Sequence, residues 1–205
     1  MRYQLLKKLQ LNLVILLTIA FLASCTVLEQ ASELQSFAKC EFRLKSVQNI
    51  RLAGVDVQQI DDVSDLTLME MAKLTTAFTS KDMPLKLTLN VEVRNPNRSK
   101  AALNELDWIL YIDDIQMTSG MLNKRTEVPP YNGLAMLPIA MEFNLFEVFS
   151  GKSADALINF ALNLTGAGNR PTRIMLKAKP SLYVGTRKIT YPGYIKLENE
   201  FTTGQ

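Results

Sequence analysis

The sequence predicts a mainly β protein, folded as a single antiparallel β-sandwich of about seven strands with one or two short helices. From Cys40 onward, apolar and polar residues alternate, which is the pattern of a strand with one buried face. Clusters of Pro, Gly, Asn and Asp separate these runs at short intervals. Only two segments show helical spacing, and they do not alternate regularly with strands, which favours a sandwich or barrel over a parallel α/β fold.

The first strands are predicted from the positions of their apolar residues. Phe42 to Leu52 suggests a long, bent strand. Residues 85–94 give the clearest strand, because every second residue is Leu or Val, and Asn95-Pro96-Asn97 ends it. Alternation over 106–112 and 115–118 around Asp113-Asp114 predicts a tight hairpin whose return strand ends at Gly120.

Later strands are predicted over 137–143 and 173–179, followed by a last hairpin from 182–184 and 189–197. Tyr191-Pro192-Gly193-Tyr194 is expected to bend or bulge that hairpin. Helices are predicted over Ser153–Leu164, with Ser153 as N-cap, and over Leu68–Phe78.

The first 24 residues have the composition of a secretory signal peptide. Arg2, Lys7 and Lys8 give a positive start, and an apolar run from Leu11 to Leu22 follows. That run is shorter than the roughly 20 residues of a transmembrane helix. We predict a signal peptide over 1–24, with an uncleaved anchor helix as the alternative.

Leu22-Ala23-Ser24-Cys25 resembles the bacterial lipobox. The resemblance implies that Cys25 carries covalent lipid, becomes the mature N-terminus and holds the protein on a membrane. Several acyl chains anchor a protein almost permanently, since each buried methylene contributes about 0.8 kcal/mol. Thr26, where a sorting rule looks for Asp, favours the outer membrane facing the periplasm. No other cofactor is expected.

The leader also accounts for the excess positive charge. Arg2, Lys7 and Lys8 leave 20 basic and 20 acidic residues in the remaining chain, so the composition gives no reason to expect a nucleic-acid partner. We expect a lipid-anchored tether over 25–39, one domain over 40–201 and a short tail over 202–205.

Signs of catalytic or metal chemistry are weak. The sequence contains no histidine, so it holds no Ser-His-Asp triad and no histidine-bearing zinc site. The carboxylates of Asp61, Asp62 and Asp65 lack the Gly and distal Glu of a calcium loop, and a solvated loop is expected. Cys40 has no partner once Cys25 is lipidated. A small buried apolar residue is expected there, with an intermolecular disulfide or a reactive thiol as alternatives.

A strand of leucines and valines ending at Asn95-Pro96-Asn97, then a hairpin and Ser119-Gly120, resembles the group 2 late embryogenesis abundant (LEA) family. Its domain is also named for water stress and the hypersensitive response. The resemblance implies a seven-stranded, fibronectin-III-like sandwich crossed by a helix, no enzyme activity and a link to dehydration. Independently of it, Asn95 and Asn97 suit bonds to nearby backbone and Pro96 presets a turn, which predicts a structural corner, with a ligand role as the alternative.

Three functions follow as expectations. The first is a non-enzymatic, lipid-anchored envelope protein that acts as a binding or stress-protective module, with an unidentified envelope protein as partner. The second is a carrier or sensor of a lipid or small apolar ligand, in a pocket between helix and sheet lined by Phe146, Phe149, Leu157 and Ala161. The same four residues also suit an ordinary core. The third, an enzyme, has the least support.

Overall fold

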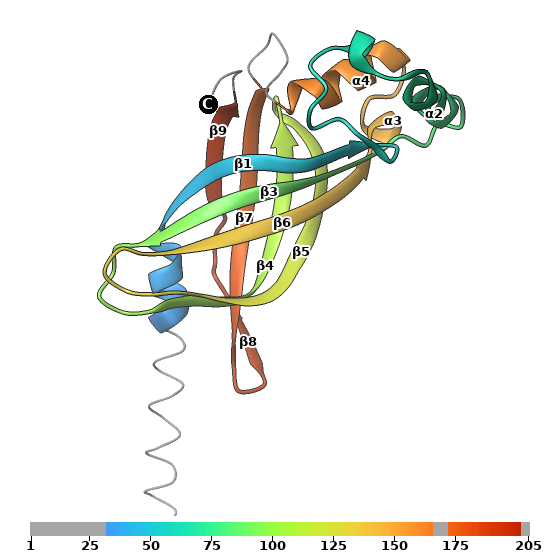
Figure 1. Ribbon diagram of the computed structural model, residues 1–205. Coiled ribbons are helices and arrows are strands. Elements are labelled where there is room, and N and C mark those ends of the chain that lie inside the picture. The colour runs from blue at the N-terminus through green and yellow to red at the C-terminus, as the bar shows by residue number, and fades with distance from the viewer. Residues whose placement is uncertain (1–31, 166–171, 202–205) are drawn as a thin grey trace, which may run out of the picture.

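Two antiparallel sheets pack face to face, and a group of short helices covers one end of them (Figure 1). The computed structural model describes residues 32–165 and 172–201. Residues 1–24, predicted to be a signal peptide, the lipidation candidate Cys25 and the tail 202–205 lie outside the described residues. The predicted fold class, a mainly β antiparallel sandwich with few short helices, is confirmed.

The four-stranded sheet has the order β2-β1-β3-β6, and in the five-stranded sheet β5, β4 and β7 are followed by both β8 and β9. The strands are β1 (Glu41–Leu52), β2 (Val55–Asp56), β3 (Pro84–Asn95), β4 (Ala101–Ile112), β5 (Ile115–Val128), β6 (Gly133–Asn144), β7 (Thr172–Val184), β8 (Arg187–Thr190) and β9 (Ile195–Phe201).

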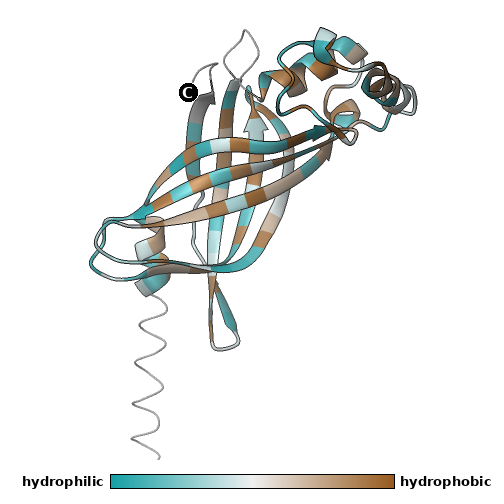
Figure 2. Cartoon of the chain, in the orientation of Figure 1, coloured by the Kyte–Doolittle hydropathy of each residue, from teal (hydrophilic) through white to brown (hydrophobic). Residues whose placement is uncertain are grey.

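The core lies between the sheets, as the alternating colours along the strands in Figure 2 indicate. In β3, every odd-numbered side chain from Leu85 to Val93 is buried, and its even-numbered neighbours face the outside. Even-numbered residues of β4 and β7 supply the opposite wall, including Trp108, Leu110 and Leu176. One contiguous cluster joins both sheets, which is how a sandwich buries the apolar face of each sheet.

Two features of the strands bear on the predictions. Asp113 and Asp114 form a two-residue turn with φ of 48° and 65°, the conformation of a type I′ hairpin turn, and this confirms the predicted hairpin. The return strand does not end at Gly120, as the sequence suggested. It continues to Val128, with Gly120 opposite Trp108. Glycine suits this position because a Cβ there would lie 2.5 Å from the indole ring of Trp108.

A proline explains why the outer strand of the second sheet is split. β8 pairs with β7 from Ser181 onward, whereas β9 pairs with β7 up to Ala178. Pro180 lies between these stretches and has no N–H to donate, while its carbonyl accepts from Tyr191 N at 2.9 Å. The bend predicted around Pro192 therefore falls where the sheet lacks a donor.

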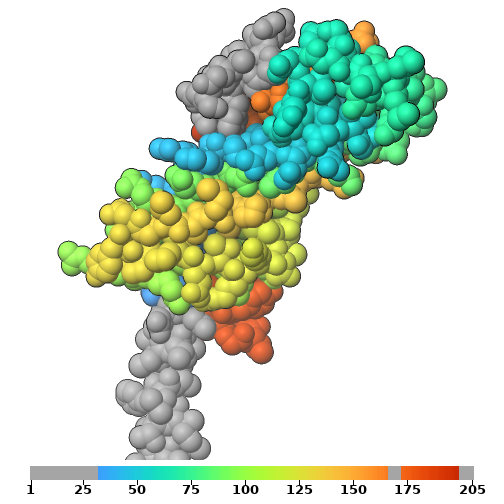
Figure 3. Space-filling view, in the orientation of Figure 1, coloured from blue at the N-terminus to red at the C-terminus, as the bar shows by residue number. Residues whose placement is uncertain are grey.

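The helical cap comprises residues 53–83 and 144–165, and it forms a lobe beyond one end of the sheets (Figure 3). Both predicted helices are present, with Thr67 and Ser153 as side-chain N-caps. The helices of the cap are η1 (Val63–Asp65), α2 (Leu68–Thr79), α3 (Leu145–Val148) and α4 (Ala154–Asn163). Asp62 caps η1 and forms hydrogen bonds with Ser64 and Asp65. Asp62 and Asp65, two of the three carboxylates expected in a solvated loop, therefore organise a turn.

Candidate functional site

A short helix lies at the end of the sandwich opposite the cap (Figure 1). Residues 32–38 form this helix, which we call the docked helix. Its sequence position falls inside the predicted tether 25–39, and the structure places it on the domain. Leu34 packs with Ala102 and Leu182, and Phe37 meets the ring of Phe42 edge-on, with centroids 5.4 Å apart.

The Asn95-Pro96-Asn97 corner holds the docked helix by its backbone. Asn95 is fully buried, and its Nδ2 donates to the carbonyls of Ser99 and Val128 at 3.0 and 3.1 Å. Its Oδ1 accepts from the backbone N–H of Asn97 at 3.0 Å and from Asn97 Nδ2 at 2.8 Å. Asn97 Nδ2 in turn donates to the carbonyl of Ser36 in the docked helix at 3.0 Å.

The two asparagines have different roles in this geometry. An amide side chain offers two donor hydrogens and an acceptor oxygen, and Asn95 uses all of them on partners at the ends of the neighbouring strands. Pro96 between them is exposed and fixes the turn. A second contact joins the same elements, because the hydroxyls of Ser36 and Ser99 lie 2.7 Å apart. The corner therefore fixes the junction between β3 and β4 and the position of the docked helix at once.

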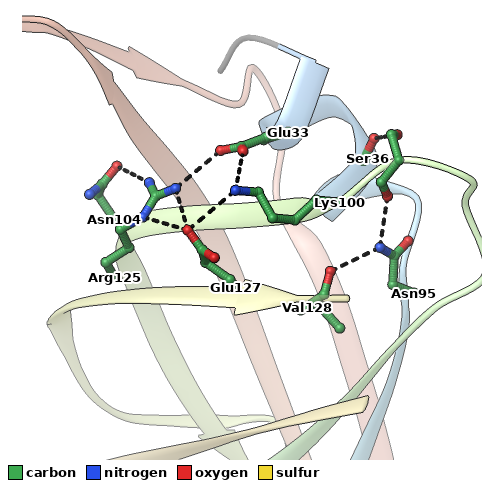
Figure 4. A network of polar contacts seen from close by, with 9 residues as sticks. Glu33, Ser36, Asn95, Lys100, Asn104, Arg125, Glu127 and Val128 are labelled. Carbon is green, nitrogen blue, oxygen red and sulfur yellow. Dashed lines mark hydrogen bonds and ion pairs between the residues drawn. The ribbon is translucent and has the colours of Figure 1, made fainter. Parts of the chain in front are cut away.

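Glu33 supplies the ionic contacts between the docked helix and the sheets (Figure 4). Its side chain is only 5% exposed, and its two carboxylate oxygens lie 2.9 Å from Lys100 Nζ and 3.2 Å from Arg125 Nη2. Arg125 also holds Glu127 at 2.7 Å. The hydrogen bond that Lys100 donates to the Glu33 carboxylate raises the pKa of Lys100, and the hydrogen bond that Arg125 donates to Glu127 lowers the pKa of Glu127.

A smaller ionic group lies beside it on β4 and the β7–β8 hairpin. Glu105 is buried and accepts hydrogen bonds from Lys188 Nζ and from Tyr183 Oη. Both bonds favour the ionised carboxylate and lower its pKa, with the larger effect from Lys188. The hydrogen bond that Tyr183 donates to Glu105 raises the pKa of Tyr183. A carboxylate held in this way serves as an anchor for the hairpin.

Cys40 closes the docked helix on the core side. The thiol is 8% exposed, and its Sγ donates to the carbonyl of Ser36 at 3.4 Å. Burial, helped by the negative charge of Glu41, raises its pKa to about 11. A thiol with so high a pKa is almost wholly protonated at neutral pH and is a poor nucleophile, which favours the structural role expected for Cys40.

The four residues of the predicted apolar pocket come together in the cap. Leu157 and Ala161 are 1% and 0% exposed, and Phe146 and Phe149 pack against the same core. The rings of Phe149 and Phe160 lie 4.8 Å apart, and Phe146 contacts Phe78. These side chains pack against one another and fill the interior of the cap.

A separate, small cavity lies between the two sheets. It has a volume of about 10 Å³ and is lined by Phe37, Phe42 and neighbouring strand residues, which is room for about one water molecule.

The sequence patterns do not reveal the two buried carboxylates of the site, Glu33 and Glu105, or their cationic partners. Glu33 is 92 residues from Arg125 in the chain. No local pattern links residues so far apart.

Within residues 32–165 and 172–201, no three His, Cys, Asp or Glu residues group as metal ligands. No helix of this described part is long and apolar enough to cross a membrane.

No protein-family model matches the chain, and no curated protein matches it. Several solved structures resemble it over most of their length, including the following two. A crystal structure of a protein from Archaeoglobus fulgidus is 16% identical, with 79% of this chain and 98% of that one covered, at a TM-score of 0.34. A solution structure of a candidate late embryogenesis abundant (LEA) protein is 12% identical, with 85% and 84% covered, at a TM-score of 0.36. Both scores are low, so functional arguments rest on the residues of this chain.

Proposed function

We propose that the protein is a non-enzymatic, lipid-anchored protein of the bacterial cell envelope, whose LEA-type sandwich acts as a binding or stress-protective module beside the membrane. The resemblance of the Asn95-Pro96-Asn97 region to the LEA family supports the type of domain. The lipobox-like Leu22-Ala23-Ser24-Cys25 supports the anchor. The proposed location is the periplasmic face of the outer membrane.

The docked helix is the observation that carries the proposal. Residue 32 belongs to the docked helix and is only seven residues after Cys25 in the sequence. A fully extended chain reaches at most about 3.6 Å per residue, so this end of the sandwich stays within roughly 25 Å of an acylated Cys25. Glu33 and the Asn97 amide fix the helix to the sheets. An anchor at Cys25 therefore sets which end of the domain faces the lipid.

The first test is acylation of Cys25. Cells that express the full chain should incorporate labelled palmitate into the protein, and the mature mass should match a chain that begins at lipidated Cys25. The Cys25→Ser variant, with Cys40 left in place, should take up no label and should not be processed. Absence of label from the wild-type protein, with residues 1–24 still attached, would contradict the proposal.

The second test separates a protective role from mere anchoring. A strain that lacks the protein should lose viability on drying, and the wild-type chain should restore it. The Cys25→Ser variant should restore it poorly if work at the membrane is essential. Crosslinking of the native lipoprotein in isolated envelopes, compared with a chain that begins at residue 26, should then identify contacts that depend on the anchor. Equal drying survival with and without the protein would remove the protective role.

A further inference from the structure

Positive charge gathers at the end of the sandwich that carries the docked helix. We call this the basic end, and it comprises residues 32–39, 96–100, 123–132 and 183–190. Its basic residues are Lys39, Arg98, Lys100, Lys124, Arg125, Arg187 and Lys188. Acidic partners are few and are held in ion pairs, since Glu33 and Glu127 bind Lys100 and Arg125, and Glu105 of β4 binds Lys188.

Negative charge gathers at the opposite end. The helical cap, residues 53–83 and 144–165, carries only three basic residues, Lys73, Lys81 and Lys152. Its acidic residues are Asp56, Asp61, Asp62, Asp65, Glu70, Asp82, Glu147 and Asp155. The chain after the leader has balanced charge overall, yet the charge is strongly divided along the molecule. Such a distribution gives the domain a dipole that orients it in an electric field.

The two ends are well separated. The 12-residue strands β1, β3 and β6 run between them, and at about 3.3 Å per residue each strand spans roughly 40 Å. This distance is several Debye lengths at physiological ionic strength, where that length is about 8 Å. A charged surface beside the basic end is therefore attracted to that end, and the acidic cap is too far away to oppose it.

We propose that the basic end is a docking surface for anionic phospholipid headgroups and holds the domain upright on the membrane that anchors it. The occupant is a lipid surface for two reasons given by the chain itself. Residue 32 emerges at this end, and the short stretch back to Cys25 brings it within reach of the bilayer. The charge at the end also complements phosphate groups. The inference rests on the proposed function for the identity of the surface.

Side chains suited to headgroups are exposed there. Arg98, Lys124 and Arg187 face solvent and form no ion pair within the described part of the chain. Tyr131, at the tip of the β5–β6 loop, is 72% exposed. Tyrosine is enriched where protein meets the headgroup layer, because its ring and hydroxyl suit that boundary. Guanidinium groups bind phosphate oxygens in a bidentate manner, so the two arginines are the best contacts for headgroups.

A chain that begins at residue 26 tests docking without the anchor. This chain keeps every residue of the two core clusters, which run from Leu34 to Leu197, so it retains the fold. It should sediment with vesicles that contain phosphatidylglycerol and remain in solution with vesicles of phosphatidylcholine alone. Binding should disappear at about 1 M salt, where the Debye length falls to about 3 Å.

Matched charge reversals locate the surface. Arg98→Glu with Arg187→Glu should weaken binding to phosphatidylglycerol vesicles about tenfold or more. Lys73→Glu with Lys152→Glu in the cap changes the net charge equally and should leave binding within about twofold. Circular dichroism checks that both variants fold. Equal weakening by the two pairs would overturn the proposal, as would equal binding to vesicles with and without phosphatidylglycerol.

Failure of the inference differs from failure of the proposed function. Vesicle binding by the chain from residue 26 does not depend on acylation, whereas palmitate labelling of the full chain does not depend on Arg98 or Arg187. Labelled Cys25 with no selectivity for anionic vesicles would leave the anchor and remove the docking surface. Selective binding without label on Cys25 would leave a peripheral membrane protein and remove the anchor.

Discussion

Asn95 shows how one buried amide fixes several segments. Its two hydrogens and its oxygen bond to Ser99, Val128 and Asn97, so the ends of β3, β4 and β5 meet around one side chain. Aspartate in its place lacks the N–H donors, and leucine lacks every polar group. The sequence predicted a corner at this position, and the structure shows that the corner also positions the docked helix through Asn97.

Asn95→Ala should lower the free energy of unfolding by about 2–4 kcal/mol, because it removes the donor to the buried carbonyl of Val128 and to the partly buried carbonyl of Ser99. Urea denaturation followed by circular dichroism measures this change. Asn123→Ala is the matched control, since Asn123 is exposed on β5 and surface changes of this kind fall within about 0.5 kcal/mol. Equal stability of the two variants would show that the corner is dispensable.

The raised pKa of Cys40 gives a pH dependence with a definite sign. The folded thiol holds its proton up to a pKa of about 11, whereas an unperturbed thiol has a pKa of 9.0. Its contribution to stability is complete below pH 9 and is lost as the pH rises towards 11, up to about 2–3 kcal/mol. Urea titrations at pH 8 and pH 10.5 should show a smaller fall for Cys40→Ala than for the wild type. A parallel fall would contradict the shift.

The elements differ in how well the sequence foretells them. β3 and α4 follow from local signals, namely strict alternation and an N-cap before an apolar stripe. The docked helix could not be predicted, because the residues that hold it in place lie far along the chain: Lys100, Arg125 and Asn97 bind it, and Leu182 packs against Leu34. Gly120 was misread as a strand end, since a glycine within a strand is explained only by the ring of Trp108 across the pair. Local sequence patterns therefore predict individual helices and strands, whereas residues far along the chain decide which of these elements pack against the sheets.

Removal of the docked helix should destabilise the domain. A chain that begins at residue 40 loses the buried side chains of Leu34 and Phe37, each worth about 1.5–3 kcal/mol, and leaves Asn97 without its carbonyl partner. Its thermal midpoint should fall well below that of a chain that begins at residue 26. Gln35→Ala provides the control and should change little, because Gln35 is exposed in the docked helix. Equal midpoints for the chains from 26 and 40 would assign residues 32–38 to the tether.

On the scale of the whole molecule, cap and sheets share one core, and we expect them to unfold as one cooperative unit. A single cluster of buried residues contains Leu74 and Leu157 of the cap together with Leu89 and Leu176 of the two sheets. Contiguous burial couples their unfolding, because loss of either part exposes apolar surface of the other.

Leu157→Ala tests that coupling. The change should cost about 2–5 kcal/mol, as expected for a fully buried leucine. Amide hydrogen exchange should report this loss equally for α4 and for β3, because both unfold in the same transition. Leu68→Ala is the control in the same cap, since Leu68 is 89% exposed and makes little core contact. Faster exchange confined to the cap would show two independent units.

The contact between Trp108 and Gly120 has a practical consequence. Trp108 is the only tryptophan of the chain, and its buried indole lies over the place where β5 has no side chain. The tryptophan fluorescence of the protein therefore comes from one known position, where β4 pairs with β5. Opening of that pair would let water reach the ring and shift the emission to the red, so the folding of the second sheet can be followed in an unlabelled protein, on a vesicle or within an intact envelope preparation.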